Sequence, residues 1–497
     1  MKRMGTLLAG IAMALPWVVQ AQSFTETALL FSRTQTGGSA RIQGMGGVQT
    51  SLGGDYSSAF SNPAGLGMFN RSEFTISPGF STANLQSSYF NTSVSENKSN
   101  LQLPGFSMVF QNDQDGRSGF LSGTFAVSYN RVNSFNQTFS YQANNPTSSI
   151  IDYFISDADG YAASAFNTNG ALNNTVTWLG YQNFLLEEDP DAATHYYSVV
   201  GGFPFQSENV QYKGYQGQWN LSYGANLSDK VFLGAGLGLT TLRFSSKKTF
   251  RESFEGEPLN SLLLEENLNI RGSGINATLG IIGRPIDLIQ VGFSYTTPTL
   301  YSITDVYSAS MATNWNNYDY YGDGSQFLNS VSDQIDEVVS EYSLKTPGKV
   351  SVGAAVFIGT NGFISADVDF VNYSGARYSS GISGISFSGD NDDIKKLYQP
   401  TANFRLGGEF RHKNLRFRLG GSYMPDPFRT EQNNINRAVT SYSGGVGYRT
   451  KKFYADFALV FAQGQSTYRP YRLNTNSPIV NLDGTRIFGM VTLGFPF

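Results

Sequence analysis

Cysteine is absent from the 497 residues of the chain, and only two histidines and 14% charged residues are present. The absence of cysteine excludes disulfides, thiolate catalysis and zinc sites built on cysteine. Lysine and arginine total 34 against 38 aspartates and glutamates, with no basic stripe, so we expect no nucleic-acid partner. After the N-terminal segment, no apolar run approaches the roughly 20 residues of a membrane-spanning helix. The chain must therefore fold without covalent cross-links or helical spans.

The first 21 residues have the pattern of a secretory signal peptide. A basic start precedes an apolar run from Leu7 to Val19, and a short stretch of small residues ends at Ala21. Pro16 interrupts the run and a cleavage pattern follows it, which argues against a transmembrane helix. We expect residues 1–21 to be removed on export.

Glycine and aromatic residues are abundant instead, with 54 Gly, 28 Tyr and 38 Phe. Residues 230–244, 349–358, 363–372 and 404–423 alternate, with apolar side chains on one face and polar residues or glycine on the other. A soluble β-sandwich would also alternate, but its exposed faces would need far more charge. The pattern predicts an all-β protein, a transmembrane β-barrel of the bacterial outer membrane whose apolar face meets lipid.

Counting such runs predicts a 14-stranded antiparallel barrel over residues 73–497, with alternating short and long connections. The short ones are the expected periplasmic turns. The long ones are expected outside the cell, with short helices in some of them, at residues 141–207, 245–265, 305–345, 374–400, 425–436 and 464–483.

Residues 22–72 precede the first strand and are predicted to form a hatch that plugs the lumen from the periplasmic side. The segment is rich in Gly, Ser and Asn and lacks an apolar period, so turn chemistry must hold it. Its motif is Asn62, Pro63, Ala64 and Gly65. Pro63 fixes its own backbone and forces Asn62 to be extended, while the Asn62 side chain can bond nearby backbone amides.

The last strand ends the chain on an aromatic residue. Ile487, Val491, Leu493, Phe495 and Phe497 share one face. A terminal Phe with apolar residues at alternate positions resembles the signal by which the barrel-assembly machinery recognises outer-membrane barrels. That machinery and the outer-membrane lipid are therefore expected partners.

Several motifs, in order along the mature chain, resemble the FadL-type long-chain fatty acid transporters, the OmpP1 and TodX group. The matching stretches are the Gly-rich run that ends in Asn62-Pro63-Ala64, and residues 68–71, 344–353, 366–374, 404–409 and 420–427. The resemblance implies a barrel blocked by an N-terminal hatch. In that family, a hydrophobic substrate lands on outside loops, enters the lumen, and leaves when the hatch shifts and a kinked third strand opens the wall.

The third strand departs from the family pattern. Relatives often carry Gly after a Tyr, whereas this chain has Tyr129-Asn130-Arg131. Gly119 and Gly123 could bend the strand elsewhere, because glycine weakens strand pairing. The position of a lateral exit is therefore open.

Apolar residues in the long loops form a candidate ligand surface. A helical period places apolar residues of the segment 330–342 on one face, with Ser330 as a possible cap. Such a patch suggests binding of a hydrophobic small molecule, or helices that pack on one another as a lid. The residues proposed for the surface are Trp178, Phe184, Leu185, Ile335, Val338, Val339 and Tyr342.

Arg405 and Arg418 are predicted on neighbouring strands and face the lumen. They could hold a ligand carboxylate by paired hydrogen bonds. Alternatively, they neutralise Glu409, Asp367 or Asp369, because an unpaired buried charge is costly.

We expect no catalytic residue, metal site or cofactor. His195 lies in a long loop and His412 at a predicted periplasmic turn, so they cannot share a triad. The acidic stretches 319–323 and 390–393 lack the spacing of a calcium-binding EF-hand.

Three functions fit these features. The first is passive, hatch-gated uptake of long-chain fatty acids or other hydrophobic compounds. The second is an outer-membrane shuttle of type IX secretion, which resembles the same family but binds protein partners. The third, a general porin, is disfavoured because the plug would obstruct it.

Overall fold

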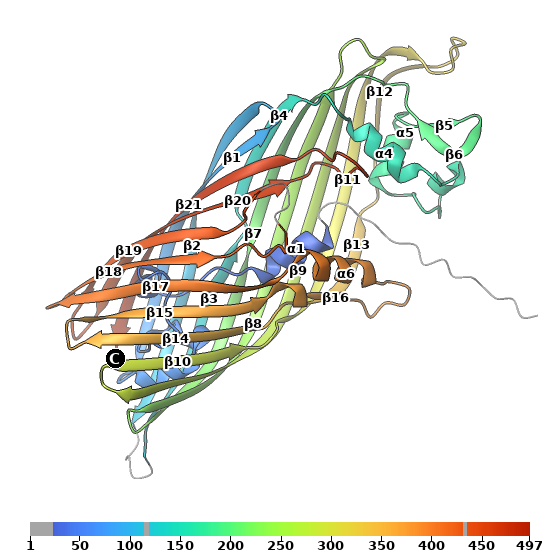
Figure 1. The fold of residues 1–497 in the computed structure, drawn as a ribbon. Coiled ribbons are helices and arrows are strands. Elements are labelled where there is room, and N and C mark those ends of the chain that lie inside the picture. The colour runs from blue at the N-terminus through green and yellow to red at the C-terminus, as the bar shows by residue number, and fades with distance from the viewer. Residues whose placement is uncertain (1–22, 114–118, 431–434) are drawn as a thin grey trace, which may run out of the picture.

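The computed structural model describes residues 23–113, 119–430 and 435–497. The predicted signal peptide, residues 1–21, lies outside the described residues. The fold is a closed antiparallel β-barrel with 14 strand positions (Figure 1), as the alternation predicted. The first strand, β1 (Glu73–Tyr89), pairs with the last, β21 (Val480–Pro496), and so closes the wall. The two terminal strands thereby satisfy each other's backbone groups, which a barrel in lipid requires.

Ten positions between these two are β2 (Thr92–Asp113), β3 (Phe120–Ser134), β7 (Phe205–Leu227), β8 (Val231–Ser253), β9 (Leu259–Ile286), β15 (Gly362–Asn372), β17 (Pro400–His412), β18 (Leu415–Met424), β19 (Val439–Arg449) and β20 (Tyr454–Tyr468). A short strand, β4 (Gln137–Asn144), continues β3, and β16 (Arg377–Ser379) follows β15. Each position pairs antiparallel with the next.

The remaining two positions are interrupted. One consists of β10 (Ile289–Thr296) and β11 (Leu300–Asp319), and the other of β13 (Val338–Lys345) and β14 (Lys349–Ile358). Pro298 lies in the first break and Pro347 in the second. Because proline has no N–H to donate to a ladder, each break falls where the sequence forbids pairing.

The long connections gather at one end of the barrel. They hold α4 (Ile150–Ala158), η2 (Ala163–Phe166), α5 (Val176–Gln182), β5 (Glu187–Asp189), β6 (Ala192–Tyr197), β12 (Phe327–Gln334), η3 (Tyr373–Gly375) and α6 (Ser388–Leu397). Figure 1 shows α4, α5, β5 and β6 beside the upper end of the wall. Of the helices in the described ranges, none is both long and apolar enough to cross a membrane.

Three expectations for these connections were wrong. The segment 305–345 is not one long loop, because β11 continues to Asp319 and most of the remainder forms β12 and β13. Residues 330–342 form no helix, because β12 and β13 pair with β11 there. The β-branched pair Val338 and Val339 opens a stretch of alternating burial, and the free edge of β11 outweighs the helical period. The segment 245–265 is not a long loop, since β8 and β9 pair as far as Ser253 and Ser261. Charged residues in this part of the wall form cross-strand ion pairs, such as Lys248–Glu266 at 3.8 Å.

The wall changes character along its length. Its lower part carries an outward-facing apolar belt, which includes Trp219, Leu221, Leu237, Leu239, Ile275, Leu279, Phe293, Val352, Leu406, Leu419 and Phe457. On β8 the outward side chains beyond Leu239 are Thr241, Arg243 and Ser245, while the inward Leu242 and Phe244 are at most 3% exposed. Beyond the belt, the outer face is therefore polar and the inner face apolar. We call this part of the wall the outer extension.

The segment before β1 lies inside the barrel (Figure 1). It contains α1 (Phe24–Ser32), α2 (Ala40–Gln43), α3 (Ser58–Ser61) and η1 (Pro63–Met68). Its apolar residues pack on inward side chains of the wall, for example Met45 and Leu52 with Ala355 and Phe363. We refer to residues 23–72 as the hatch segment.

Candidate functional site: the barrel lumen

Asn62 joins the hatch segment to the wall. Its side-chain amide donates to the Thr50 carbonyl at 2.6 Å and shares further contacts, each at 3.3 Å, with the carbonyls of Ile281 and Phe293. Its Oδ1 accepts from the Ala64 amide at 3.2 Å, and its backbone is extended. The predicted turn chemistry of Asn62 and Pro63 is confirmed. The two bonds to wall strands were not predicted from the sequence.

Glycines on the inner face of the wall let the hatch backbone come close. A Cβ at Gly280 would lie 1.8 Å from Asn62 Oδ1, and one at Gly292 would lie 2.0 Å from the Thr50 carbonyl oxygen. The same holds at Gly407, where a Cβ would lie 2.1 Å from the Met45 carbonyl oxygen. These contacts leave no room for a side chain, so the wall glycines form the seat of the hatch segment. Their inward positions are visible in the alternation, but their partners are not.

Arg405 lies in an ion-pair network on the inner face of the wall. Its Nη2 contacts Asp369 at 2.6 Å and Asp367 at 3.8 Å. Asp367 Oδ2 also accepts from the amides of Gln49 and Thr50, at 2.7 and 2.8 Å. The arginine therefore neutralises two carboxylates, one of which holds the backbone of the hatch segment.

Arg418 lies in a second network. Its Nε contacts Glu409 at 2.8 Å and its Nη1 contacts Asp456 at 2.7 Å. Arg41 of the hatch segment reaches the same Glu409 at 3.4 Å. Both arginines thus have the arrangement expected of the structural alternative. Capture of a ligand carboxylate by Arg405 or Arg418 stays a prediction.

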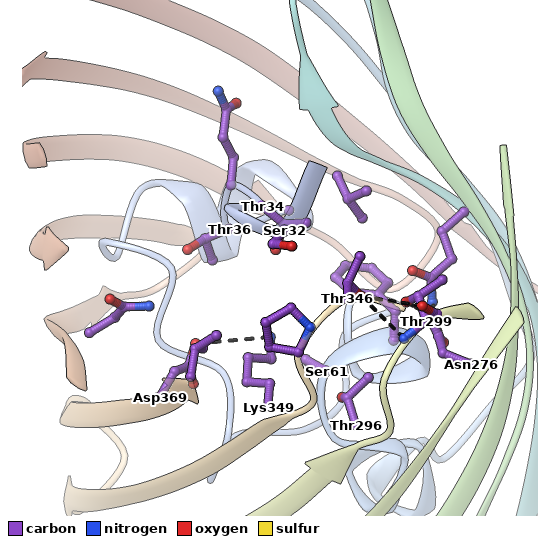
Figure 2. A pocket seen from close by; sticks show the side chains of 18 of the residues that line it. Ser32, Thr34, Thr36, Ser61, Asn276, Thr296, Thr299, Thr346, Lys349 and Asp369 are labelled. Atoms are coloured by element: carbon purple, nitrogen blue, oxygen red, sulfur yellow. Dashed lines mark hydrogen bonds and ion pairs between the residues drawn. The ribbon is translucent and has the colours of Figure 1, made fainter. Parts of the chain in front are cut away.

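A cavity of about 130 Å³ lies between parts of the hatch segment and the wall, and both polar and apolar side chains line it. Figure 2 shows hydroxyl groups of Ser32, Thr34 and Thr36 on one side and Lys349 with Asp369 on another. Lys349 Nζ lies 3.9 Å from Asp369. The remaining labelled residues come from the wall and the hatch segment, namely Ser61, Asn276, Thr296, Thr299 and Thr346. This cavity can hold water or a small polar group.

A second, larger cavity of about 400 Å³ lies between the hatch segment and the strands β1, β2, β3, β4, β18, β19, β20 and β21. Its lining combines apolar residues such as Leu85, Val460 and Phe488 with the guanidinium of Arg486. Within the described ranges Arg486 has no acidic partner, in contrast to Arg405. The sequence placed Arg486 in the last strand, on the face opposite Ile487, so its inward direction could have been read from the alternation.

The wall beside this cavity is not continuous. The ladder between β2 and β3 runs from Asp113–Ser122 to Gly105–Asn130, and β4 pairs with β7 only. The register of β3 shifts between Arg131 and Asn133. Beyond Asn130, β2 and β3 contact each other through side chains. In one such contact, Arg131 Nη1 donates to Gln102 Oε1 at 2.9 Å.

The hatch segment contacts the shifted part of β3. The amide of Gln35 donates to the Val132 carbonyl at 2.9 Å, and the amide of Gly38 donates to Asn130 Oδ1 at 3.3 Å. The register of β3 against β7 shifts here without a glycine after Tyr129, and it shifts a second time between Phe120 and Ser122, close to Gly119 and Gly123. The position of a lateral exit stays a prediction.

The candidate ligand surface in the outer loops is largely internal. Leu185, Ile335 and Tyr342 are at most 6% exposed and belong to one apolar cluster, against which Trp178, Phe184 and Val338 pack half-buried. Only Val339, 60% exposed, faces outward among the seven proposed residues. The structure thus brings six of them to a common core and leaves the seventh on the surface. Ligand binding by this set stays a prediction.

Comparisons with known proteins place the fold. No family model and no curated protein matches the sequence. Among solved structures, a FadL homologue of Pseudomonas aeruginosa aligns with a TM-score of 0.55 and 12% identity, over 94% of this chain and 99% of that one. The toluene transporter TodX of Pseudomonas putida aligns with a TM-score of 0.51 and 12% identity, over 94% of this chain and 100% of that one. The toluene transporter TbuX of Ralstonia pickettii aligns with a TM-score of 0.51 and 14% identity, over 93% of this chain and 99% of that one.

These alignments cover nearly the whole chain, so the expected resemblance holds at the level of the fold. The closed wall and its apolar belt make the protein an outer-membrane barrel.

Proposed function

We propose, on the premise that the chain has the fold of the FadL and TodX channels, that it takes up small hydrophobic compounds passively across the outer membrane. Long-chain fatty acids are the substrate class expected from the sequence. The observation that carries the proposal is the end of the β2–β3 ladder at Gly105–Asn130, beside the 400 Å³ cavity. A compound in that cavity has a lateral route into the bilayer.

The contact between Arg131 and Gln102 is the proposed latch of this route. It crosses the unpaired part of the wall on side chains alone, at 2.9 Å. Side-chain contacts can separate without breaking a backbone ladder, whose loss in lipid would be costly. Leu101, 88% exposed, lies next to the latch on the lipid side. The hatch segment reaches the same place through Gln35 and Val132, so its movement would act on the gap directly.

The cavity fits an amphipathic substrate. Its apolar lining suits an alkyl chain. Three arginines, Arg33, Arg131 and Arg486, line the same cavity, and no ion pair of Arg486 is found among the described residues. A carboxylate is the group that a guanidinium binds best, through two parallel hydrogen bonds. This favours a fatty acid over a neutral aromatic hydrocarbon.

The test uses the absence of cysteine. In Q102C/R131C, a short bis-maleimide with a reducible spacer should join β2 to β3 and abolish uptake of labelled fatty acid, and reduction should restore it. The matched control is T82C/S99C, which cross-links β1 to β2 where they are already paired. Unchanged uptake after complete cross-linking at 102 and 131 would rule out this route. Co-purification of a secreted protein in place of a lipid would instead favour the type IX shuttle.

A further inference from the structure

Two arginines face each other on the outer surface of the wall. Arg243 on β8 is directly opposite Arg271 on β9, and both side chains are exposed. Opposed residues on neighbouring strands have Cβ atoms about 4.5–5.5 Å apart, and like charges at that distance destabilise the pair. Within the described residues, neither arginine has an acidic partner.

A second pair of cations repeats the arrangement. Lys345 on β13 is directly opposite Arg377 on β16. Arg377 Nη1 donates to the carbonyls of Ser374 and Ala376, at 2.7 and 2.6 Å, which are neutral acceptors. The exposed Lys213 on β7 is opposite Ser245, two residues along β8 from Arg243. Together we call Lys213, Arg243, Arg271, Lys345 and Arg377 the basic surface.

The basic surface lies at the outer margin of the apolar belt. Leu239 pairs with Ile275, Ile275 with Leu300, and Leu300 with Lys345, so these four residues form one row across the wall. The first three are exposed apolar residues and the fourth is a lysine. The head groups of a bilayer extend about 5–7 Å beyond its hydrocarbon core. The cations therefore begin where lipid head groups begin.

Acidic groups on the same face are few. Glu265 is already paired with Lys247 at 4.0 Å, and Glu341 is exposed on β13. The basic surface thus carries an excess of positive charge, which the protein's own described residues do not neutralise. An anion from outside the chain would relieve the repulsion within both opposed pairs.

We propose that the basic surface binds the phosphate groups of outer-leaflet lipids, and specifically a glycolipid with more than one phosphate. Guanidinium groups bind phosphate oxygens in a bidentate manner, and two opposed arginines can share one phosphate. The adjacent belt residues accept the acyl chains of the same molecule. This inference is independent of the transported substrate.

The test measures the apparent unfolding temperature of the full mature protein in a neutral maltoside detergent. Added lipid A, which carries two phosphates, should raise this temperature, and lipid A stripped of phosphate should not. In R243Q/R271Q the affinity for lipid A should fall about tenfold or more. Without lipid, the double variant should unfold at the same temperature as the unsubstituted protein or higher, because the repulsion is gone.

The control is R251Q, which removes an exposed arginine further along the outward face of β8 and should bind lipid A normally. K345Q provides a second test if the double variant fails to fold. Equal affinity of R243Q/R271Q and the unsubstituted protein would overturn the proposal. Equal stabilisation by inorganic phosphate would also overturn it, since the site would then bind a free ion and no lipid.

Discussion

The side-chain amide of Asn62 donates to the main-chain carbonyl of Ile281 from inside the barrel, at 3.3 Å. The bond reaches the wall through a backbone group, where no side chain at position 281 is needed. The glycine preceding it, Gly280, provides the space for Asn62 to approach. The fit of the hatch segment therefore depends on the missing side chain at Gly280 of the wall as much as on the amide of Asn62.

Substitution of that glycine should displace the hatch segment. In G280A the new Cβ would lie 1.8 Å from Asn62 Oδ1, well inside van der Waals contact. We expect ion conductance through the barrel in planar bilayers, and we expect the unsubstituted protein to conduct far less. G283A is the control on the same strand, because a Cβ there has nothing within 4 Å. If G280A and G283A conduct alike, the close approach does not seat the hatch segment.

Removal of the charge at Glu409 should destabilise the barrel strongly. This carboxylate contacts Arg41, Arg411 and Arg418, and E409Q would leave buried guanidinium groups without a full partner. Breaking a buried ion pair costs about 3–5 kcal/mol. Heat-induced unfolding, followed by gel mobility, measures the loss. The exposed pair Lys396–Asp393, at 3.9 Å, supplies the control: K396Q should change the unfolding free energy by less than about 0.5 kcal/mol.

Attachment of α4 should weaken as pH rises. Glu252 lies near the outer end of β8, far beyond the apolar belt, and accepts from Ser149 Oγ at 2.5 Å and the Ile150 amide at 2.8 Å. Burial raises the pKa of Glu252 to about 7, from 4.5. A carboxyl group whose pKa is raised in the folded state contributes its full stabilisation of that state at low pH. This contribution is lost as the pH rises from about 4.5 to about 7.

Amide hydrogen exchange in α4, corrected for the intrinsic pH dependence, measures this effect. Protection of residues 150–158 should be greater at pH 5 than at pH 8, and E252Q should remove the difference. Glu255 is exposed and lies three residues further along the chain, just after β8. E255Q should therefore keep the difference. Equal protection at both pH values in the unsubstituted protein would contradict the prediction.

Arg486 should distinguish charged from neutral substrates. In R486Q the cavity keeps its apolar lining and the arginines Arg33 and Arg131 but loses the guanidinium of Arg486. Fatty-acid affinity should therefore fall about tenfold or more while toluene binding stays unchanged. Equilibrium binding of both compounds to purified protein provides the comparison. R405Q is a useful second variant, because its partners Asp367 and Asp369 predict lost stability. A parallel loss of affinity for both compounds in R486Q would indicate a structural role instead.

Alternation predicted the wall well because lipid and lumen impose opposite requirements on successive residues. The 14 positions follow from that pattern, and Pro298 and Pro347 mark the breaks. The outer extension was harder to predict. Its charged outward residues, such as Lys247 and Glu265, are typical of loops, and only the cross-strand pairing makes them parts of strands.

The sequence predicted individual residues of the site better than it predicted which residues they contact. Asn62 and Pro63 were recognised from turn chemistry, which is local. The partners of Asn62 on β9 and β10 are more than two hundred residues away, and periodicity has no information on such distances. The same limit applies to Arg486. Its inward direction was readable from the alternation, but the cavity it lines is built from eight strands and the hatch segment.

Because the polarity of the two faces reverses along β8, the two halves of this strand tolerate different substitutions. Up to Leu239, an outward position tolerates a larger aliphatic side chain and rejects a charge, as in a membrane protein. From Arg243 onward, the same outward register tolerates charge, and its inward neighbour Phe244 obeys the rules of a water-soluble core. A single hydropathy scale applied to the whole strand would misjudge mutations in one half. The boundary at Thr241 is the place to join an engineered outer extension to an unrelated barrel.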